Sequence, residues 1–146
     1  MKTTPGIAAT LLCVAIVVTC EAARAQNVLI VVNKSSASSM ITNSQLHDIF
    51  IGTRTRFADG SRAIPVLLKG GPVHEVFLHH YLGDSPEEFR VRWRKAVFTG
   101  EGSMPKEFAS EAALLDYVAA TPGAIGYVSR VPDPDSVRVM TVSAQQ

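Results

Sequence analysis

The chain has 146 residues, and its 14 basic and 13 acidic residues give a formal net charge of +1 when histidine is neutral. This near balance argues against a nucleic-acid-binding protein, because such proteins usually carry an excess of basic residues. Both cysteines, Cys13 and Cys20, lie in the first 25 residues, so the rest of the chain has no cysteine nucleophile, thiolate metal ligand or disulfide. One domain over residues 26–146 is expected at this length.

The first 25 residues have the pattern of a secretory signal peptide. Lys2 supplies a positive charge, residues 7–19 are apolar and uncharged, and Ala23-Arg24-Ala25 fits a small-residue cleavage site. The apolar stretch is shorter than the roughly 20 residues that a membrane-spanning helix needs. Cleavage near Ala25 is therefore favoured over anchoring, and we expect a secreted, periplasmic protein.

A buried strand and a short helix are the first elements expected after this segment. Residues 28–32 read VLIVV, a continuous branched apolar run that is typical of a strand buried on both faces. Thr42 and Gln45 have the spacing of a capping box, which predicts a helix over residues 43–51. Gly52 follows at the position where a left-handed helix cap is expected.

A second strand and a second helix come next. Residues 63–68 are expected to form the strand, and Pro65 within it cannot donate to a ladder, so the strand is expected to start at a sheet edge or a bulge. Pro72 suits the first position of a helix, which is expected to continue to about Leu82 and to end near Gly83.

Ser85, Pro86 and Glu88 are the start signal of a third helix, which is expected to end at Thr99. Glu88 and Arg92 are spaced to form an ion pair one turn apart. The expected buried stripe of this helix consists of Phe89, Trp93, Ala96 and Val97.

The last helix is expected between Ser110 and Thr121, followed by strands over residues 124–128 and 137–142. Helices first alternate with strands along the chain and then cluster. This order predicts an α/β sandwich with a mixed sheet flanked by helices.

Three features, in this order, resemble periplasmic phosphate-binding proteins. Residues 46–52, LHDIFIG, are similar to the L-x-x-I-F-x-G helix of that family, and Phe57 lies where the family usually has tryptophan. Residues 122–128, PGAIGYV, are similar to the family's P-G-[AS]-I-G-Y-V return strand. The resemblance covers residues 28–130 and is to one lobe of a type 2 periplasmic binding protein.

The resemblance implies a single-lobe fold and a non-enzymatic solute-binding module for phosphate or another small oxyanion. It also implies a role in ABC-type uptake and no cofactor. Full members of the family close two lobes on the anion, whereas this chain has the length of one.

The loop after the second expected strand is the first candidate site. Lys69, Gly70 and Gly71 lead into a helix N-terminus, whose free N–H groups and positive dipole favour an anion. The resemblance places the family's ligand loop here, but its hydroxyl ligands are absent, and Lys69 replaces an arginine without the bidentate fork. The candidate anion ligands are Lys69, the backbone of Gly70 and Gly71, and His74. The alternative is a strand-to-helix turn that only requires glycine.

Asn33, Ser35 and Ser36 form a second candidate group, after the first strand. Ligands of open α/β sheets bind beyond the carboxyl ends of strands, which would allow this loop and the Lys69 loop to face one pocket. The alternative, a solvated loop, is preferred.

Two other functions are not favoured by the residue pattern. His74, His79 and His80 do not have the i, i+3 or i, i+4 spacing that would bring all three to one helix face, so no metal site is expected. The chain also has no G-x-S-x-G elbow, no P-loop and no recognisable carboxylate pair, so no enzyme is expected.

Arg90, Arg92, Arg94 and Lys95 form a basic cluster, which is either a solvated helix face or a docking surface for an acidic partner. A binding module and an interaction scaffold therefore both stay open. The expected partners are a small oxyanion, the membrane subunits of an ABC transporter or an envelope protein, and no nucleic acid. A third hypothesis is that two copies pair as a homodimer that rebuilds a two-lobed cleft.

Overall fold

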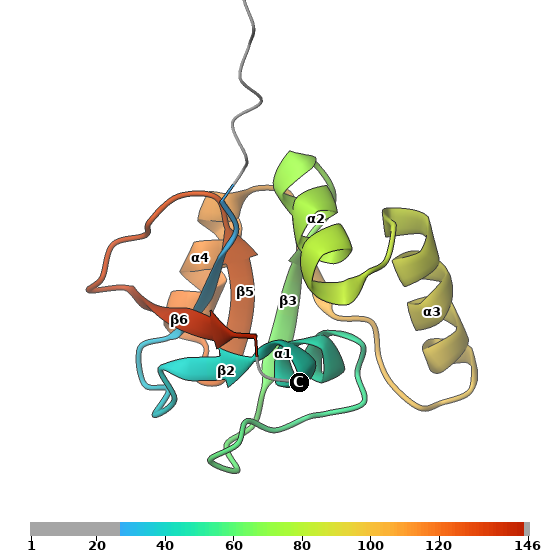
Figure 1. Ribbon diagram of the computed structural model, residues 1–146, viewed down its shortest axis with the longest axis horizontal. Helices are drawn as coiled ribbons and strands as arrows, with labels where there is room; N and C mark the ends of the chain where they lie inside the picture. The colour runs from blue at the N-terminus through green and yellow to red at the C-terminus, as the bar shows by residue number, and fades with distance from the viewer. Residues whose placement is uncertain (1–26, 145–146) are drawn as a thin grey trace, which may run out of the picture.

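The computed structural model describes residues 27–144, so the expected signal peptide lies outside the described residues. The chain forms a six-stranded mixed sheet with helices on both faces (Figure 1). The strands are β1 (Leu29–Asn33), β2 (Met40–Thr42), β3 (Ile64–Leu68), β4 (Lys106–Phe108), β5 (Ala124–Val128) and β6 (Val137–Ser143). The helices are α1 (Asn43–Phe50), α2 (Pro72–Phe77), the π-helical η1 (Leu78–Leu82), α3 (Pro86–Phe98) and α4 (Glu111–Ala120).

The strand order across the sheet is β2-β6-β1-β5-β3-β4. β1 runs antiparallel to both of its neighbours, β5 and β6. β3 runs parallel to both of its neighbours, β5 and β4, and β2 runs parallel to β6. β1 is antiparallel to β5 and β3 is parallel to it, so β1 and β3 run in opposite directions. The loops at their carboxyl ends therefore leave opposite ends of the sheet.

Consecutive residues of β5 show how the helices are divided between the two faces. A Cβ added at Gly126 would lie 2.8 Å from Cδ2 of Leu114, so this position faces α4. Tyr127 points to the other face, where its ring stacks on Phe77 with 3.9 Å between centroids and lies 6.1 Å from the ring of Phe50. Because successive strand residues alternate in direction, α4 covers one face, and α1 and α2 cover the other (Figure 1).

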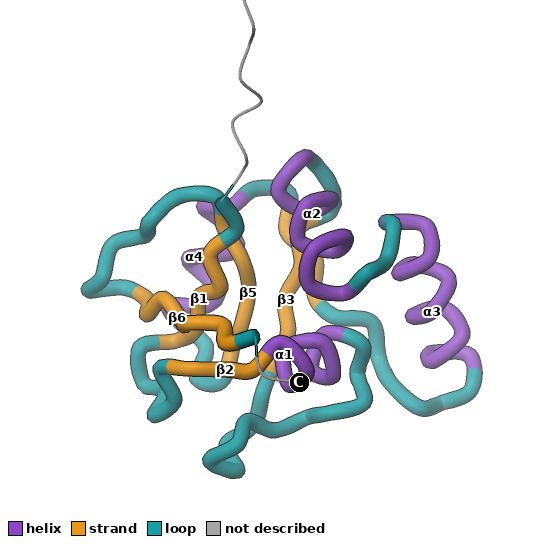
Figure 2. Tube along the Cα trace, in the orientation of Figure 1, coloured by secondary structure: helices purple, strands orange, loops and turns teal. Residues whose placement is uncertain are grey.

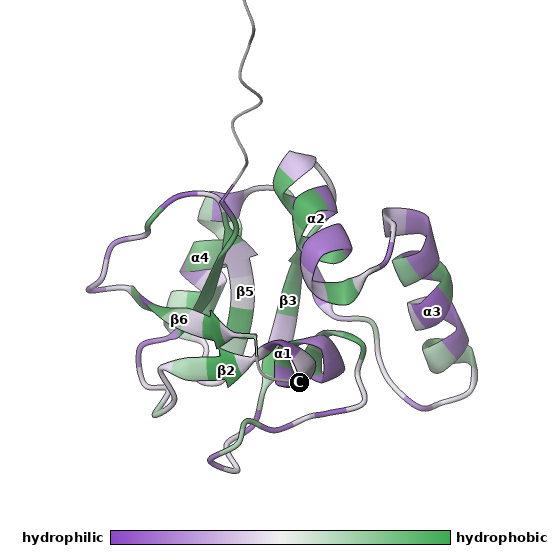
Figure 3. Ribbon diagram, viewed as in Figure 1, coloured by the Kyte–Doolittle hydropathy of each residue, from purple (hydrophilic) through white to green (hydrophobic). Residues whose placement is uncertain are grey.

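The local signals in the sequence form the structures that they predict. The side chains of Thr42 and Ser85 each cap a helix, and both capping boxes are complete. Gly52 and Gly83 adopt the left-handed conformation after α1 and η1, with φ of 86° and 69°. Figure 3 shows the hydrophobic colour along β1, in agreement with a strand covered on both faces.

Pro65 lies in β3, an interior strand, at a position where its missing N–H leaves no hydrogen bond of the sheet unmade. The N–H of Ile64 donates to Gly123 O on the β5 side, so the nitrogen of Pro65 faces the β4 side. β4 pairs with β3 only from Val66 onward. The expected sheet edge therefore exists only locally, at the first residues of β3.

Three features were not expected from the sequence: the short strands β2 and β4, and the π-helical turn η1 that continues α2. In addition, the expectation that Val97 is buried is wrong, since its relative exposure is 48%. α3 lies at the side of the molecule next to α2 (Figure 2), and it buries only the narrow stripe that contains Phe89 and Trp93.

Candidate functional site

The loop at the carboxyl end of β3 forms the entrance to α2. The N–H of Lys69 donates to Phe108 O and continues the pairing with β4, after which the chain turns through Gly70 and Gly71. Gly71 has φ of 93°, a left-handed value that favours glycine, and it caps α2 without a side-chain hydrogen bond. The N–H groups in the first turn of α2 therefore have no side-chain cap. Pro72, the first residue of the helix, has no N–H and contributes no donor.

A groove of about 230 Å³ lies beside this loop, and the start of α4 forms its other wall. Gly70, Gly71, Ser110 and Glu111 are among its lining residues. Two helix N-termini therefore border one groove, which favours an anion. The carboxylate of Glu111 opposes that preference, and it is held by Ser129, whose N–H and hydroxyl donate to it over 2.8 and 2.9 Å.

His74 lies in the interior of the protein and does not line the groove. Its Nδ1 is 2.6 Å from the hydroxyl oxygen of Tyr127, which also accepts the N–H of Leu68 over 3.0 Å. Burial lowers the pKa of His74, with Glu75 raising it and Arg90 lowering it by smaller amounts. Burial also raises the pKa of Tyr127, so its hydroxyl stays protonated while it shares this hydrogen bond with the imidazole.

Asn33, Ser35 and Ser36 lie at the opposite end of the sheet from Lys69, so the hypothesis of one shared pocket is wrong. The reason is the antiparallel direction of β1 relative to β3, which the residue pattern did not reveal. Ser35 and Ser36 border a separate groove of about 220 Å³ together with Arg62.

Asn33 has a structural role in that region. Its side-chain amide donates to the carbonyl oxygens of Val118 and Ala119 over 2.8 and 2.9 Å, and so it caps the end of α4. Its amide oxygen accepts the N–H and the hydroxyl of Ser35. The Ser36 hydroxyl is buried without a partner within residues 27–144.

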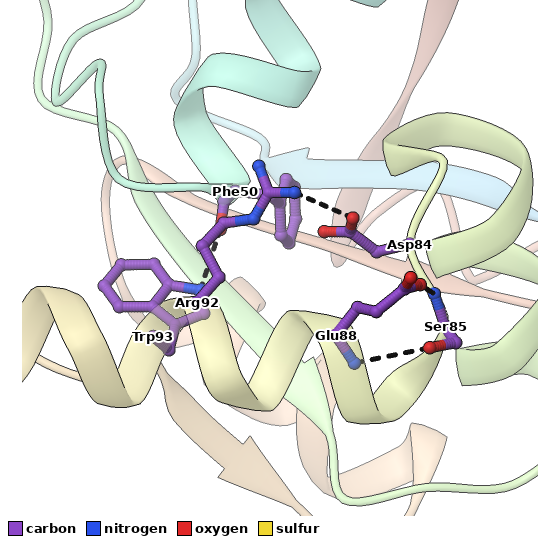
Figure 4. Close-up of polar contacts among 6 residues, drawn as sticks. All are labelled: Phe50, Asp84, Ser85, Glu88, Arg92 and Trp93. Atoms are coloured by element: carbon purple, nitrogen blue, oxygen red, sulfur yellow. Dashed lines mark hydrogen bonds and ion pairs between the residues drawn. The ribbon is translucent and has the colours of Figure 1, made fainter.

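The ion pair expected between Glu88 and Arg92 does not form. Glu88 instead accepts the N–H of Ser85 over 2.8 Å, and Arg92 pairs with Asp84 over 2.8 Å (Figure 4). The capping role takes the carboxylate away from Arg92. Trp93, also drawn in Figure 4, donates its indole N–H to Phe50 O over 3.1 Å and joins α3 to α1.

Two findings concern metals and membranes. No group of three or more His, Cys, Asp or Glu side chains within the described part of the chain is arranged to hold a metal ion. Between residues 27 and 144, every helix is too short or too polar to span a membrane.

The fold is similar to proteins of phosphate transport systems. No protein-family model and no curated protein sequence matches the chain. An ABC-type phosphate transport receptor from Vibrio cholerae aligns with 79% of this chain and 45% of its own, at 17% identity and a TM-score of 0.58. PstS from Borrelia burgdorferi aligns with 82% of this chain and 48% of its own, at 14% identity and a TM-score of 0.58.

A structure with bound phosphate is also among these neighbours. This Clostridium perfringens protein, assigned as a phosphate ABC transporter substrate-binding protein, aligns with 79% of this chain and 44% of its own, at 22% identity and a TM-score of 0.56. At such identities the likeness establishes the fold alone. The chain spans less than half the length of each of these proteins, which is consistent with a short, single-lobe form of the same α/β fold.

Two residues of the site region were not singled out by the sequence. Tyr127 was noted only as part of the PGAIGYV strand, although a tyrosine inside a fully buried strand signals that its hydroxyl has a buried partner. Glu111 carried no signal beyond its place in the first turn of a helix, because its contact with Ser129 depends on how α4 packs against β5.

Proposed function

We propose that this protein is a secreted, non-enzymatic solute-binding module that takes phosphate or a similar small oxyanion for ABC-type uptake. The groove between the Lys69 loop and the start of α4 is the proposed site. One observation carries the proposal: two helix N-termini border this groove, in a fold similar to proteins of phosphate transport.

Lys69, Gly70 and Gly71 are the proposed ligands from the β3 side. The glycines let an anion approach the backbone closely. Lys69 is exposed and is not among the residues that line the groove, so in this proposal its positive charge acts from the position next to Gly70. The buried position of His74 and its bond to Tyr127 argue against His74 as a direct ligand.

Glu111 sets a ceiling on affinity in this proposal. A carboxylate about 4 Å from a bound anion costs about 1 kcal/mol even in water, and more where solvent is excluded. The hydroxyl ligands implied by the family resemblance are also absent from the Lys69 loop. We therefore expect weaker binding than in a protein that closes two lobes on its anion.

The test is the melting temperature of the protein with phosphate, sulfate or acetate at constant ionic strength. A ligand at a hundred times its Kd stabilises by about 2.7 kcal/mol, which corresponds to a shift of a few degrees. Lys69→Ala is expected to weaken phosphate binding about tenfold or more, the equivalent of one charge-assisted hydrogen bond. Glu111→Gln is expected to strengthen it several-fold.

Arg94→Ala, on an exposed part of α3, is the matched control for lost positive charge and is expected to bind as the parent does. The absence of a shift with any of the anions, or equal shifts for the parent and Lys69→Ala, contradicts the proposed site. The homodimer stays a prediction that a concentration-dependent mass would support.

A second candidate function is that of an envelope interaction domain, and the outer face of α3 favours it. Phe98 is 92% exposed and Val91 is 51% exposed, and both lie among the exposed basic residues Arg94 and Lys95. Aromatic and basic side chains on one exposed face fit an anionic membrane surface.

Sedimentation with phosphatidylglycerol vesicles tests this second candidate. The parent is expected to sediment with these vesicles and not with phosphatidylcholine vesicles. A variant carrying Arg94→Gln, Lys95→Gln and Phe98→Ser is expected to stay in solution. Equal sedimentation of the two proteins contradicts a role of this face.

A further inference from the structure

A cleft of about 280 Å³ lies between the end of α1, α3 and the loop that precedes β4. It is close to the lower end of the range of roughly 300–1,000 Å³ that ligand pockets usually have. This size favours a small molecule over a nucleotide or a saccharide chain. The function proposed above does not use this cleft.

The apolar part of the cleft is built around Trp93. The indole ring lies close to the backbones of two glycines, since a Cβ at Gly52 or Gly102 would lie 2.7 or 3.2 Å from a ring carbon. Ile64 and Met104 also line the cleft. Trp93 is 3% exposed, so a ligand in the cleft meets the small part of the ring that reaches the surface, together with Ile64 and Met104.

The polar part of the cleft carries an excess of positive charge. Arg54, Arg62 and Lys106 line it, against one carboxylate, that of Glu101. The N–H of Ala63 donates to the carbonyl oxygen of Thr55 over 2.9 Å. Thr55 follows Arg54 and Ala63 follows Arg62, so the segments that carry the two arginines lie side by side.

The two guanidinium groups are free to bind a ligand. Within residues 27–144, neither Arg54 nor Arg62 has a side-chain hydrogen bond or an ion pair. Lys106 differs, because its ammonium group lies over the ring of Tyr117, 4.9 Å from the centroid. Arginine presents a planar fork of donors that matches a carboxylate.

We propose that this cleft binds a small amphipathic carboxylate. The carboxylate pairs with Arg54 and Arg62, and the hydrocarbon part lies against Trp93 and Met104. The charge balance of the cleft selects an anion, its apolar wall selects hydrocarbon over a bare oxyanion, and its volume limits the length of the ligand.

This site is independent of the proposed phosphate groove. Residues 62–65 lead into and begin β3, whereas Lys69 follows its last residue, so the two sites lie at opposite ends of that strand. A variant that no longer binds phosphate in the groove is therefore expected to bind the carboxylate in the cleft as the parent does, and the reverse.

Fluorescence of Trp93 reports binding directly, because no other tryptophan contributes. The full chain is titrated at constant ionic strength with hexanoate and cyclohexanecarboxylate, which do not absorb at the excitation wavelength. The matched neutral probes are 1-hexanol and cyclohexylmethanol, and inorganic phosphate is the oxyanion probe. We expect a saturable change with both carboxylates and at least tenfold weaker binding of the alcohols.

Two variants test the role of charge. Arg54→Gln combined with Arg62→Gln is expected to weaken carboxylate binding at least tenfold, while Glu101→Gln is expected to strengthen it several-fold. Arg94→Gln, on the same helix as Trp93 but outside the cleft, is expected to keep the parent affinity. Circular dichroism and the melting temperature establish that each variant is folded.

Three outcomes overturn the proposal. The first is a response that does not saturate with either carboxylate. The second is parent affinity in the folded double arginine variant. The third is a fluorescence response to inorganic phosphate that equals or exceeds the response to the carboxylates and is lost in the double arginine variant. This result would show that the cleft binds a bare oxyanion.

Discussion

The hydroxyl oxygen of Tyr127 lies 2.6 Å from Nδ1 of His74, so that a buried strand and the buried face of α2 share one polar contact. The same oxygen accepts the N–H of Leu68, the last residue of β3. One hydroxyl therefore ties together β5, β3 and α2, and the last two of these elements border the groove beside Gly70 and Gly71. This relationship leads to the first two predictions.

Tyr127→Phe is expected to lower the free energy of unfolding by about 1–3 kcal/mol, because it leaves two buried polar groups without their partner. Urea denaturation at neutral pH measures the change. Tyr117→Phe is the control, since that hydroxyl makes no hydrogen bond within residues 27–144, and a change of less than about 0.5 kcal/mol is expected. Equal losses in the two variants would contradict the structural role of the Tyr127 hydroxyl.

Stability is expected to fall on mild acidification because of His74. Burial lowers its pKa below the ordinary value of 6.5, so the unfolded state binds a proton more readily than the folded state. The stabilisation is complete above pH 6.5 and is lost as the pH falls through the lowered folded value. Urea denaturation at several pH values between 5 and 7.5 measures this loss, which is expected to shrink in His74→Gln.

His79→Gln is the control for this pH dependence, because His79 is exposed on the adjoining turn. The pKa values of Asp59 and Glu88 are also lowered, mainly by hydrogen bonds from Ser61 and Ser85. The stabilisation from those two carboxylates is lost only as the pH falls below their ordinary pKa values of 3.8 and 4.5. These values lie below the pH range over which the stability is measured here. An unchanged pH slope in His74→Gln would show that another group is responsible.

Arg92→Met is expected to destabilise the protein by about 1–3 kcal/mol, because Asp84 is buried and loses its ion-pair partner. The second carboxylate oxygen of Asp84 already has no partner within the described residues. Adding Asp84→Asn is expected to recover part of the loss. Denaturation of both variants tests this, with Arg94→Met as a control that should change little; a similar cost at both arginines counts against the pair.

Gly123→Ala is expected to destabilise the protein more than Gly60→Ala. Both glycines have nearly the same left-handed φ, 85° and 84°, so the backbone cost of about 1–2 kcal/mol is common to them. A Cβ at Gly123 would also collide with the backbone oxygen of Arg62, whereas one at Gly60 meets nothing within 4 Å. Equal melting temperatures for the two variants would show that the contact at β5 relaxes without cost.

Much of the fold could be predicted because its signals are local. The capping boxes at Thr42 and Ser85, the glycine helix ends and the continuous apolar strands each depend on neighbouring residues only. The two strands that were missed, β2 and β4, are three residues long, and each is defined by its pairing partner rather than by its own pattern. The resemblance to phosphate-binding proteins supplied the overall arrangement.

The candidate site was predicted less completely, because it depends on strand direction and side-chain packing. The Lys69 loop does lie at a helix N-terminus, as the glycines and Pro72 indicated. Nothing in the residue pattern states that β1 runs against β3, so the pattern could not exclude a pocket shared by Lys69 with Ser35 and Ser36. The burial of His74 follows only from its contact with Tyr127, 53 residues away in the chain.

The place of β5 in the sheet has a consequence for how the chain folds during synthesis. β5 lies between β1 and β3, so Val31 pairs with Gly126 and Ile64 pairs with Ala124. The early strands cannot join each other directly and must wait for a segment near the end of the chain. Such long-range pairing slows folding, and a partly synthesised chain that still lacks β5 cannot complete the centre of its sheet.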